Sequence, residues 1–207
     1  MSSPPALSTR IFTDADAHLI PYLAAIHANC ITADHAIVTF LPPINHDRLL
    51  QFWKDCIADV RSGTRTIILL FDESHSSDPP VSAGPAAMVP GNPGATSQKT
   101  LDGLHLMGVV MLAMPYSETG SFRGWVEKLL VSPKFRRRGG ARALIGALEK
   151  EALSRGKTLL MADTESGTVA EEMYKKLGFV EVGKIPGFAT SPAGGLRDET
   201  FFYKHLT

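Results

Sequence analysis

The segment from residue 129 to residue 154 constrains the fold more than any other part of the chain. An apolar run, Leu129–Val131, precedes a basic turn, Lys134–Arg138, and two glycines then open an amphipathic stretch that reaches Ser154. Apolar residues spaced three or four positions apart predict a helix there. We therefore expect a strand, a turn and a helix in succession. The free backbone N–H groups at the start of such a helix, together with its dipole, favour an anion.

The side chains of this turn suit a phosphate group. Gly139, Gly140 and Ala141 place no large side chain in the way of an oxygen that approaches the backbone. Arginines beside them can add charge-assisted hydrogen bonds. The turn lacks the Gly-Lys-Ser/Thr of a P-loop and the Gly-x-Gly-x-x-Gly of a dinucleotide fold, so neither nucleotide fold is favoured. A basic turn that is merely solvated is the alternative interpretation.

The order of the other predicted elements favours one α/β domain. Apolar or alternating runs predict strands, helical spacing predicts helices, and Pro and Gly mark the breaks. Residues 1–7 are expected to be flexible, and the domain to span 8–207 with a Pro/Gly/Ser-rich insertion at about 72–103. A loop is expected at 183–197. The predicted strands are 8–12, 66–71, 105–114, 125–131, 158–162, 179–182 and 199–203, and the predicted helices are 13–29, 45–63, 140–154 and 168–177.

Composition excludes several classes of function. The 207 residues include 21 basic and 21 acidic side chains, so no net charge attracts nucleic acid or an anionic membrane. Nucleic-acid binding would depend on Lys134–Arg138 alone and is disfavoured. The chain has no apolar run of the ~20 residues that span a bilayer and no secretory signal, which predicts a cytoplasmic protein. The scattered histidines lack ligand spacing, and Cys30 and Cys56 are too few for a disulfide framework, so no metal site is expected.

Two motifs in the second half of the chain resemble those of a known family. Residues Arg136–Ala141 fit Arg/Gln-x-x-Gly-x-Gly/Ala between a strand and a helix, and Ala170–Phe179 form a helix with a tyrosine that ends in Gly-Phe. Both are similar to motifs of the GCN5-related N-acetyltransferase (GNAT) superfamily. Within it, the chain looks closest to the tabtoxin-resistance-type acetyltransferases, in segments such as 40–43, 185–189 and 200–204. Arg137 departs from a frequent glycine, and Ala141 replaces the commoner final glycine.

The resemblance implies a single-domain GNAT fold. Its mixed central sheet has about seven strands, a splay between the fourth and fifth strands, and about four flanking helices. Acetyl-CoA would bind in the splay as the co-substrate, without a metal, and a homodimer is compatible with the exposed edge strands of such a sheet. The backbone of Leu129, Leu130 and Val131 would pair with the pantetheine arm. The remaining cofactor-binding residues that the resemblance implies are Arg136, Arg137, Arg138, Gly139, Gly140, Ala141, Arg142 and Thr164.

Direct acetyl transfer to an amine requires a deprotonated amine, a polarised thioester and a proton for the departing thiolate. The resemblance gives the last role to Tyr174, whose alternative is to pack on the core. It gives the role of base or water organiser to Asp163, whose alternative is to cap the following helix. Glu127 is the competing base, because the period of two places it on the same strand face as Leu129 and Val131.

The expected activity is therefore transfer of an acetyl group from acetyl-CoA to a primary amine of a small molecule, with a toxin or antibiotic as a candidate acceptor and detoxification as the role. One alternative is acetylation of a protein lysine or N-terminus, and another is a sensor that binds acyl-CoA without catalysis. Acceptor choice varies freely on one fold. The expected acceptor walls combine apolar contacts with carboxylates that hold a cationic amine, from Phe40, Ile185, Phe188, Asp47, Glu127, Glu165 and Asp198.

Overall fold

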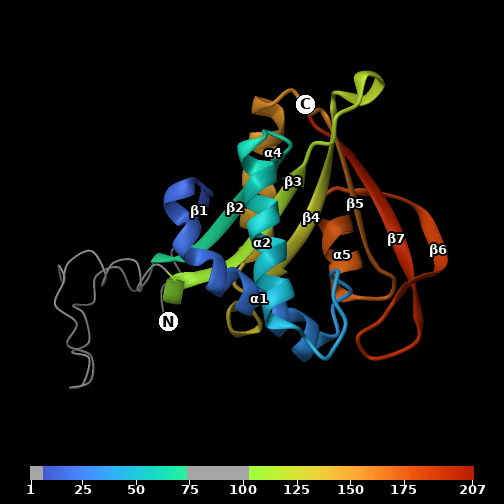
Figure 1. Ribbon diagram of the computed structural model, residues 1–207. Coiled ribbons are helices and arrows are strands. Elements are labelled where there is room, and N and C mark those ends of the chain that lie inside the picture. The colour runs from blue at the N-terminus through green and yellow to red at the C-terminus, as the bar shows by residue number, and fades with distance from the viewer. Residues whose placement is uncertain (1–6, 74–102) are drawn as a thin grey trace, which may run out of the picture.

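The computed structural model describes residues 7–73 and 103–207 (Figure 1). Residues 1–6 and nearly all of the insertion expected at 72–103 lie outside the described residues. The strands are β1 (Leu7–Ile11), β2 (Arg65–Asp72), β3 (Leu106–Ala113), β4 (Arg123–Val131), β5 (Leu159–Glu165), β6 (Val180–Thr190) and β7 (Leu196–His205). The α-helices are α1 (Ile20–Asp34), α2 (His46–Arg61), α4 (Gly140–Ser154) and α5 (Val169–Lys176), and the short 3-10 helices are η1 (Asp14–Leu19), η3 (Glu118–Gly120) and η4 (Pro133–Phe135).

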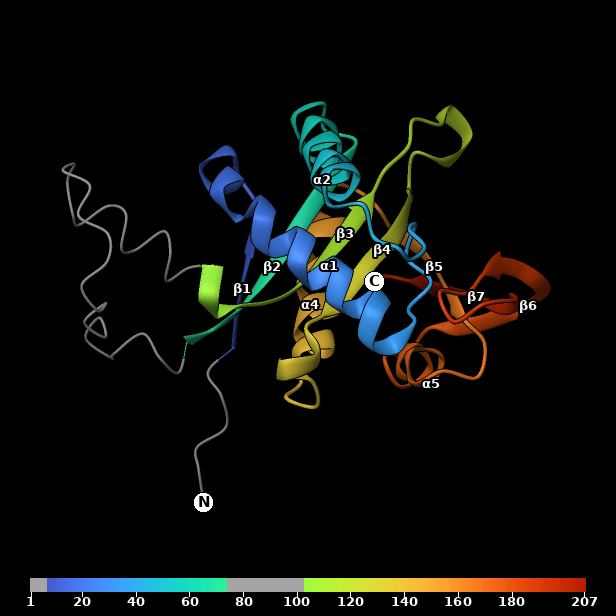
Figure 2. The ribbon, with the colours of Figure 1, turned by 60° about the horizontal axis from the view of Figure 1, so that its bottom comes forward.

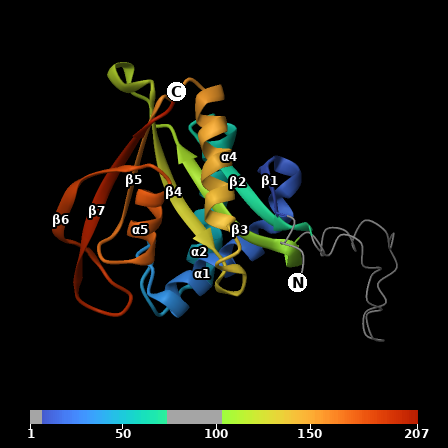
Figure 3. The same cartoon turned by 180° about the vertical axis from the view of Figure 1, so that it is seen from behind.

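The strands form one seven-stranded sheet in the order β1-β2-β3-β4-β5-β7-β6. The strands β4 and β5 run parallel, and the other neighbours are antiparallel. The β4–β5 pairing covers only Arg123–Trp125 of β4 and Leu159–Met161 of β5. Beyond these residues the two strands diverge, and α5 lies at the divergence in Figures 1 and 3. The expected α/β GNAT fold with a splay between its fourth and fifth strands is thus confirmed.

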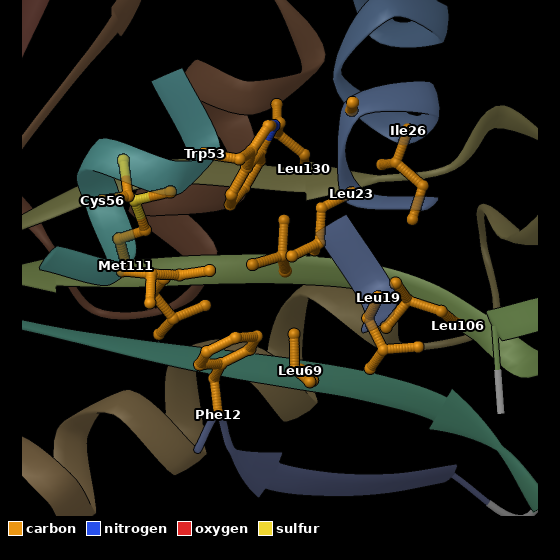
Figure 4. Close-up of a cluster of buried hydrophobic side chains, with 14 of the residues drawn as sticks. Phe12, Leu19, Leu23, Ile26, Trp53, Cys56, Leu69, Leu106, Met111 and Leu130 are labelled. Carbon is orange, nitrogen blue, oxygen red and sulfur yellow. The ribbon is translucent and has the colours of Figure 1, made fainter. Parts of the chain in front are cut away.

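Helices cover both faces of the sheet. The helices α1 and α2 lie over β2, β3 and β4 on one face, and α4 lies on the other, as the views from the front and from behind show (Figures 1 and 3). Alternation along β3 serves both faces, because Val109 and Met111 enter the core under α1 and α2 while Val110 and Leu112 enter the core under α4. Figure 4 shows the first core, in which Trp53, Leu23 and Met111 converge.

Local signals explain where the helices begin. The Asn45 side chain accepts a hydrogen bond from the backbone of Arg48 at 2.9 Å, so the predicted N-cap of the second helix is confirmed. The first helical segment differs from the prediction of one helix over 13–29. Residues Asp14–Leu19 form a 3-10 helix, and α1 begins at Ile20 and continues to Asp34, because Pro21 favours the first turn of a new helix.

The prediction of a loop at 183–197 is wrong. Most of this segment belongs to the hairpin of β6 and β7, which flank the sheet beyond β5 (Figure 2). Gly187, at φ +61°, and Pro186 are typical of a turn, which is why the sequence predicted a loop. The two strands absorb these residues as register shifts, one of them between Ile185 and Ala189. None of the helices in the described part of the chain is long and apolar enough to cross a membrane.

Candidate active site

The free edge of β4 faces the splay. Its other edge pairs with β3, where a bulge between Leu130 and Glu127 inserts an extra residue. Lys128 occupies this bulge with φ +50°, a left-handed conformation that is uncommon outside glycine. Because β4 and β5 no longer pair beyond Trp125, the backbone of Leu129–Val131 is not paired with β5. An extended ligand can therefore add to this edge as a strand would.

The turn that follows β4 opens on the N-terminus of α4. The 3-10 helix η4 continues the chain, Gly139 at φ +85° is the N-cap residue, and no side chain caps the helix. A Cβ on Gly140 would lie 2.7 Å from Leu70 Cδ2, so this glycine is required for close packing of α4 on the sheet. Arg137 takes φ +58°, at the position where glycine is frequent in the motif. The turn thus keeps its left-handed backbone there without glycine.

The four arginines of the turn have different surroundings. Arg136 forms an ion pair with Asp34 at the end of α1 and donates to the Val131 carbonyl oxygen at 3.3 Å. Arg138 pairs with the buried carboxylate of Asp72 at 3.3 Å. Arg137 and Arg142 are exposed and form no ion pair within residues 7–73 and 103–207. Arg136 and Arg138 therefore hold the turn in place, whereas Arg137 and Arg142 leave their charge available at the start of α4.

Tyr174 of α5 is buried, with 4% of its surface exposed. Its ring stacks on Phe202 at 5.5 Å and meets the edge of Phe179 at 5.2 Å. Burial, and the nearby charge of Asp163, raise the pKa of the phenol well above its ordinary value. The hydroxyl therefore stays protonated throughout the physiological pH range. Tyr174 therefore both packs on the core and lies near Asp163.

Asp163 lies on β5 two residues beyond Met161, where the pairing with β4 ends, and its side chain is exposed. Thr164 follows on the opposite face of the strand, paired with Thr200 of β7. The cap that the sequence offered as the alternative for Asp163 comes instead from Thr168, whose hydroxyl accepts from the backbone of Glu171 at 3.4 Å. Asp163 is thus free of helix capping.

Sequence analysis missed Glu199, a buried carboxyl on β7 beside Asp163. The side chain is 4% exposed, and its Oε2 has no hydrogen-bond partner. Burial, the hydrogen bond with Asp163 and the charges of Asp163 and Glu165 raise its pKa to about 7, which the positive charge of Lys128 partly opposes. The sequence around Glu199 carries no signal of this kind, because the charged neighbours of Glu199 come from β4 and β5.

Glu127 has a different environment from Asp163. Its Oε2 accepts from Arg65 at 2.5 Å, and Arg65 also pairs with Asp59 at 3.1 Å. Together with Trp125 these three residues line a surface pocket of about 410 Å³. The carboxylate of Glu127 is thus already neutralised by an arginine. It forms a wall of the pocket at the same level of the sheet as Asp163.

The other expected acceptor residues divide into two groups. Ile185 and Phe188 are exposed on β6, where Phe188 meets the edge of Phe201 at 5.3 Å. Glu165 pairs with Arg197 at 3.4 Å, and Asp198 accepts from the backbone of Gly187 at 2.8 Å. Phe40 packs instead in an aromatic group with His27 and Phe52, and Asp47 lies in the first turn of α2.

Cys30 and Cys56 are unpaired and buried in the core under α1 and α2. Burial raises the pKa of the Cys56 thiol to about 11, so it stays protonated. Within the described ranges, no group of three or more His, Cys, Asp and Glu side chains could hold a metal ion.

Comparison with known proteins agrees with this geometry. The Acetyltransferase (GNAT) family model matches residues 91–179, a range that includes β4, the turn and α5. Among solved structures, one similar chain is YncA of Salmonella typhimurium, assigned as an acetyltransferase and solved with its cofactor acetyl-CoA. It is 18% identical with a TM-score of 0.65, and the match covers 98% of this chain and 95% of that chain.

Two further structures have the same fold. One, assigned as a phosphinothricin N-acetyltransferase, is 16% identical with a TM-score of 0.68 and coverage of 98% of this chain and 99% of that chain. The other is the Salmonella typhimurium acetyltransferase that modifies the N-terminal serine of the ribosomal protein L7/L12. It is 13% identical with a TM-score of 0.68 and coverage of 99% and 97%. These three structures share the fold of this chain, and the family model matches the segment that holds the basic turn and α5.

Proposed function

We propose that the protein transfers the acetyl group of acetyl-CoA directly to a primary amine of a small molecule. The observation that carries this proposal is the free edge of β4, which leads to the uncapped N-terminus of α4. A pantetheine arm carries amide groups that can pair with such an edge, and a pyrophosphate suits the free N–H groups and exposed guanidinium groups that follow it. The pantetheine arm and the pyrophosphate would thus bind to β4 and to the start of α4, which follow each other in the chain.

In this proposal the backbone of Leu129, Leu130 and Val131 binds the pantetheine arm. The amides of Gly139, Gly140 and Ala141 bind the pyrophosphate, and Arg137 and Arg142 supply charge. Arg136 and Arg138 hold the turn in place through Asp34 and Asp72 as well as adding positive charge. Thr164 lines the β5 side of the splay.

The acetyl transfer needs two proton movements. An ammonium acceptor first gives a proton to a base, and the neutral amine attacks the thioester carbon, so that a C–N bond forms and the C–S bond breaks. The nitrogen loses a second proton as the thiolate leaves, and we assign protonation of that thiolate to Tyr174. The second proton from the nitrogen passes through water to the phenolate and restores Tyr174. We assign the base to Asp163, because Glu127 is held in an ion pair by Arg65. Glu127 then serves the acceptor pocket.

The class of acceptor follows from the resemblance. The resemblance to the tabtoxin-resistance-type enzymes supports a small-molecule amine and a detoxifying role in the cytoplasm. A protein lysine or N-terminus is the alternative, which the ribosomal-protein-modifying relative keeps open. We also propose that residues 8–207 act as a single domain, and that the exposed outer strand β6 offers an edge for a homodimer.

The first experiment measures the melting temperature of the purified protein with acetyl-CoA, CoA or NAD. A ligand that binds only the folded state raises the melting temperature by mass action. We expect a rise with both CoA species and none with NAD, because the pyrophosphate turn lacks the dinucleotide motif. Absence of a shift at saturating acetyl-CoA would refute the cofactor site.

Thiol release is then followed over a panel of small amines, lysine peptides and N-terminal peptides. Release with small amines supports the proposal, whereas release with peptides alone supports the protein-modifying alternative. A CoA-induced shift without thiol release on any acceptor supports the sensor. Arg142→Gln is a useful variant, because the loss of one exposed charge should weaken acetyl-CoA binding about tenfold without changing the fold.

A further inference from the structure

The carboxyl group of Glu199 is buried on β7 beside the carboxyl group of Asp163. It lies within hydrogen-bonding range of the Asp163 carboxyl, so the two groups can share one proton. Its Oε2 is buried and accepts no hydrogen bond from a donor among the described residues. A buried carboxyl oxygen without a partner is costly, so a fold that retains one calls for a physical reason.

Strand register explains why the two carboxyls meet. In the antiparallel β5–β7 pair, Asp163 lies opposite Phe201 and Glu165 lies opposite Glu199. Directly opposed residues share a face, so all of these side chains project to the same side. Phe202 and Ala162, which are one residue out of phase, enter the core under α4 and α5. The carboxyl pair is therefore on the face opposite α5.

This face is also the face of the proposed acceptor pocket. Trp125 pairs with Met161 in the last register of the parallel ladder. Two residues further along each strand come Glu127 and Asp163, so the two carboxylates lie at the same level on opposite sides of the splay. Glu127 faces Arg65, whereas Asp163 has Glu199 beside it. The carboxyl pair therefore stands across the splay from the pocket.

The charges around the pair favour a shared proton. Glu165 adds negative charge, although Arg197 pairs with it at 3.4 Å. Lys128 is the cation that acts on Glu199, and the Tyr174 phenol is neutral. Burial and the acidic neighbours outweigh the lysine, so the pKa of Glu199 rises to about 7. A base with a pKa near neutrality is matched to proton abstraction at physiological pH.

We propose that Asp163 and Glu199 form a proton-sharing carboxyl pair, in which exposed Asp163 receives the proton of a cationic amine and buried Glu199 strengthens it as a base. The inference rests on the proposed function and deepens it, because it defines the acceptor as an ammonium ion rather than an amine that is already neutral. Asp163 contacts the acceptor. Glu199 is a positioning residue that acts through Asp163.

The step balances without a further reactant. The pair begins with a net charge of minus two, and the R–NH₃⁺ group transfers one proton to it, which leaves the proton between the two carboxyls and the amine neutral. The lone pair then attacks the thioester carbon as already described. After product release the proton passes to water, which restores the pair. Glu199 thus stores a proton for part of each turnover and is chemically unchanged at the end.

The pair can be tested without any substrate. Side-chain carboxyl ¹³C NMR titration of the full-length protein should show one resonance with a midpoint near pH 7 that disappears in Glu199→Gln. Glu172→Gln, which changes an exposed carboxylate of α5 in the same way, is the matched control and should leave that resonance in place. Titration of Glu199 near the ordinary value of 4.5 would overturn the proposal.

Kinetics test the role of the pair. We compare the pH dependence of kcat/KM for an alkylamine and for an aromatic amine, which is neutral at pH 7 and needs no base. With the alkylamine, Glu199→Gln should lower kcat about 100-fold and move the acidic limb at least 2 pH units downwards. Glu199→Asp should restore much of the limb. The aromatic amine should lose less than about threefold, because base catalysis contributes little to its transfer.

Equal losses on both amines with an unchanged acidic limb would mean that Glu199 is merely structural, and would overturn the inference. Retention of the acetyl-CoA-induced melting shift in each variant shows that the protein is folded and loaded. If the wild-type protein acetylates no amine at all, the proposed function fails, while the ¹³C titration still decides whether the two carboxyls share a proton.

Discussion

Replacement of Glu199 by glutamine should stabilise the protein at alkaline pH, although the side chain is buried. The folded-state pKa of about 7 lies above the ordinary value of 4.5, so the folded protein binds this proton more tightly than the unfolded chain does. The resulting stability is fully present below pH 4.5 and is lost as the pH rises through 7. Glutamine cannot ionise, so the variant should escape this loss.

The magnitude follows from the two pKa values. At about 1.36 kcal/mol for each pH unit, the interval from 4.5 to 7 corresponds to at most about 3.4 kcal/mol. Water at the mouth of the splay screens the neighbouring charges, and we therefore expect about 1.5 kcal/mol between pH 5 and pH 8. With an m-value of about 2 kcal/mol/M, this is a change of about 0.7 M in the urea midpoint.

The assay is urea denaturation of the wild type and Glu199→Gln at pH 5 and pH 8. His27 complicates the wild-type curve, because burial lowers its pKa to about 4 and its contribution is lost as the pH falls from 6.5. This contribution is present in both proteins, so the difference between them isolates Glu199. A variant that loses the same stability as the wild type between the two pH values would refute the reasoning.

Three other predictions concern the turn and the phenol. Tyr174→Phe should keep the acetyl-CoA-induced melting shift and lower kcat about 100-fold or more, and equal turnover by both proteins would exclude the phenol as the proton donor. Gly139 has φ +85°, so Gly139→Ala should destabilise the protein by about 1 kcal/mol. Gly146 lies inside α4 with open space around a Cβ, so Gly146→Ala should stabilise the protein by about 0.8 kcal/mol. Urea denaturation measures both changes. In a double-mutant cycle of stability, Arg136→Gln and Asp34→Asn should show a coupling energy of about 0.5–1 kcal/mol. Each substitution alone should weaken acetyl-CoA binding by a similar factor. Independent effects on stability would contradict an ion pair that holds the turn against α1.

Much of the fold could be predicted from local patterns. Strand β3 is a continuous apolar run, and α4 and α2 carry apolar residues at helical spacing, so their secondary structure is encoded within each segment. The hairpin of β6 and β7 could not be predicted in the same way. Pro186 and Gly187 favour a turn locally, and only the pairing with β7 on the sheet overrides that preference.

The same contrast between local and tertiary information holds for the candidate site. The sequence indicated the basic turn, because its glycines and arginines are contiguous. It left Asp163, to which the resemblance gave the role, and Glu127 as competing bases, because nothing within either strand distinguishes them. The distinction comes from Arg65, which is distant in the sequence and neutralises only Glu127. Glu199 could not be predicted for the same reason, since its acidic neighbours Asp163 and Glu165 belong to another strand.

The sequence by itself determined the kind and order of most elements, and the segment that suits a phosphate, because these depend on residues that are neighbours in the chain. Tertiary structure alone decided which arginines of the turn remain available, which carboxylate is neutralised, and which carboxyl is buried beside another. These properties depend on burial and on charges brought together from β2, β4, β5 and β7. Electrostatic energies vary steeply with distance and solvent exposure, which are fixed only when the strands pair and the helices cover them.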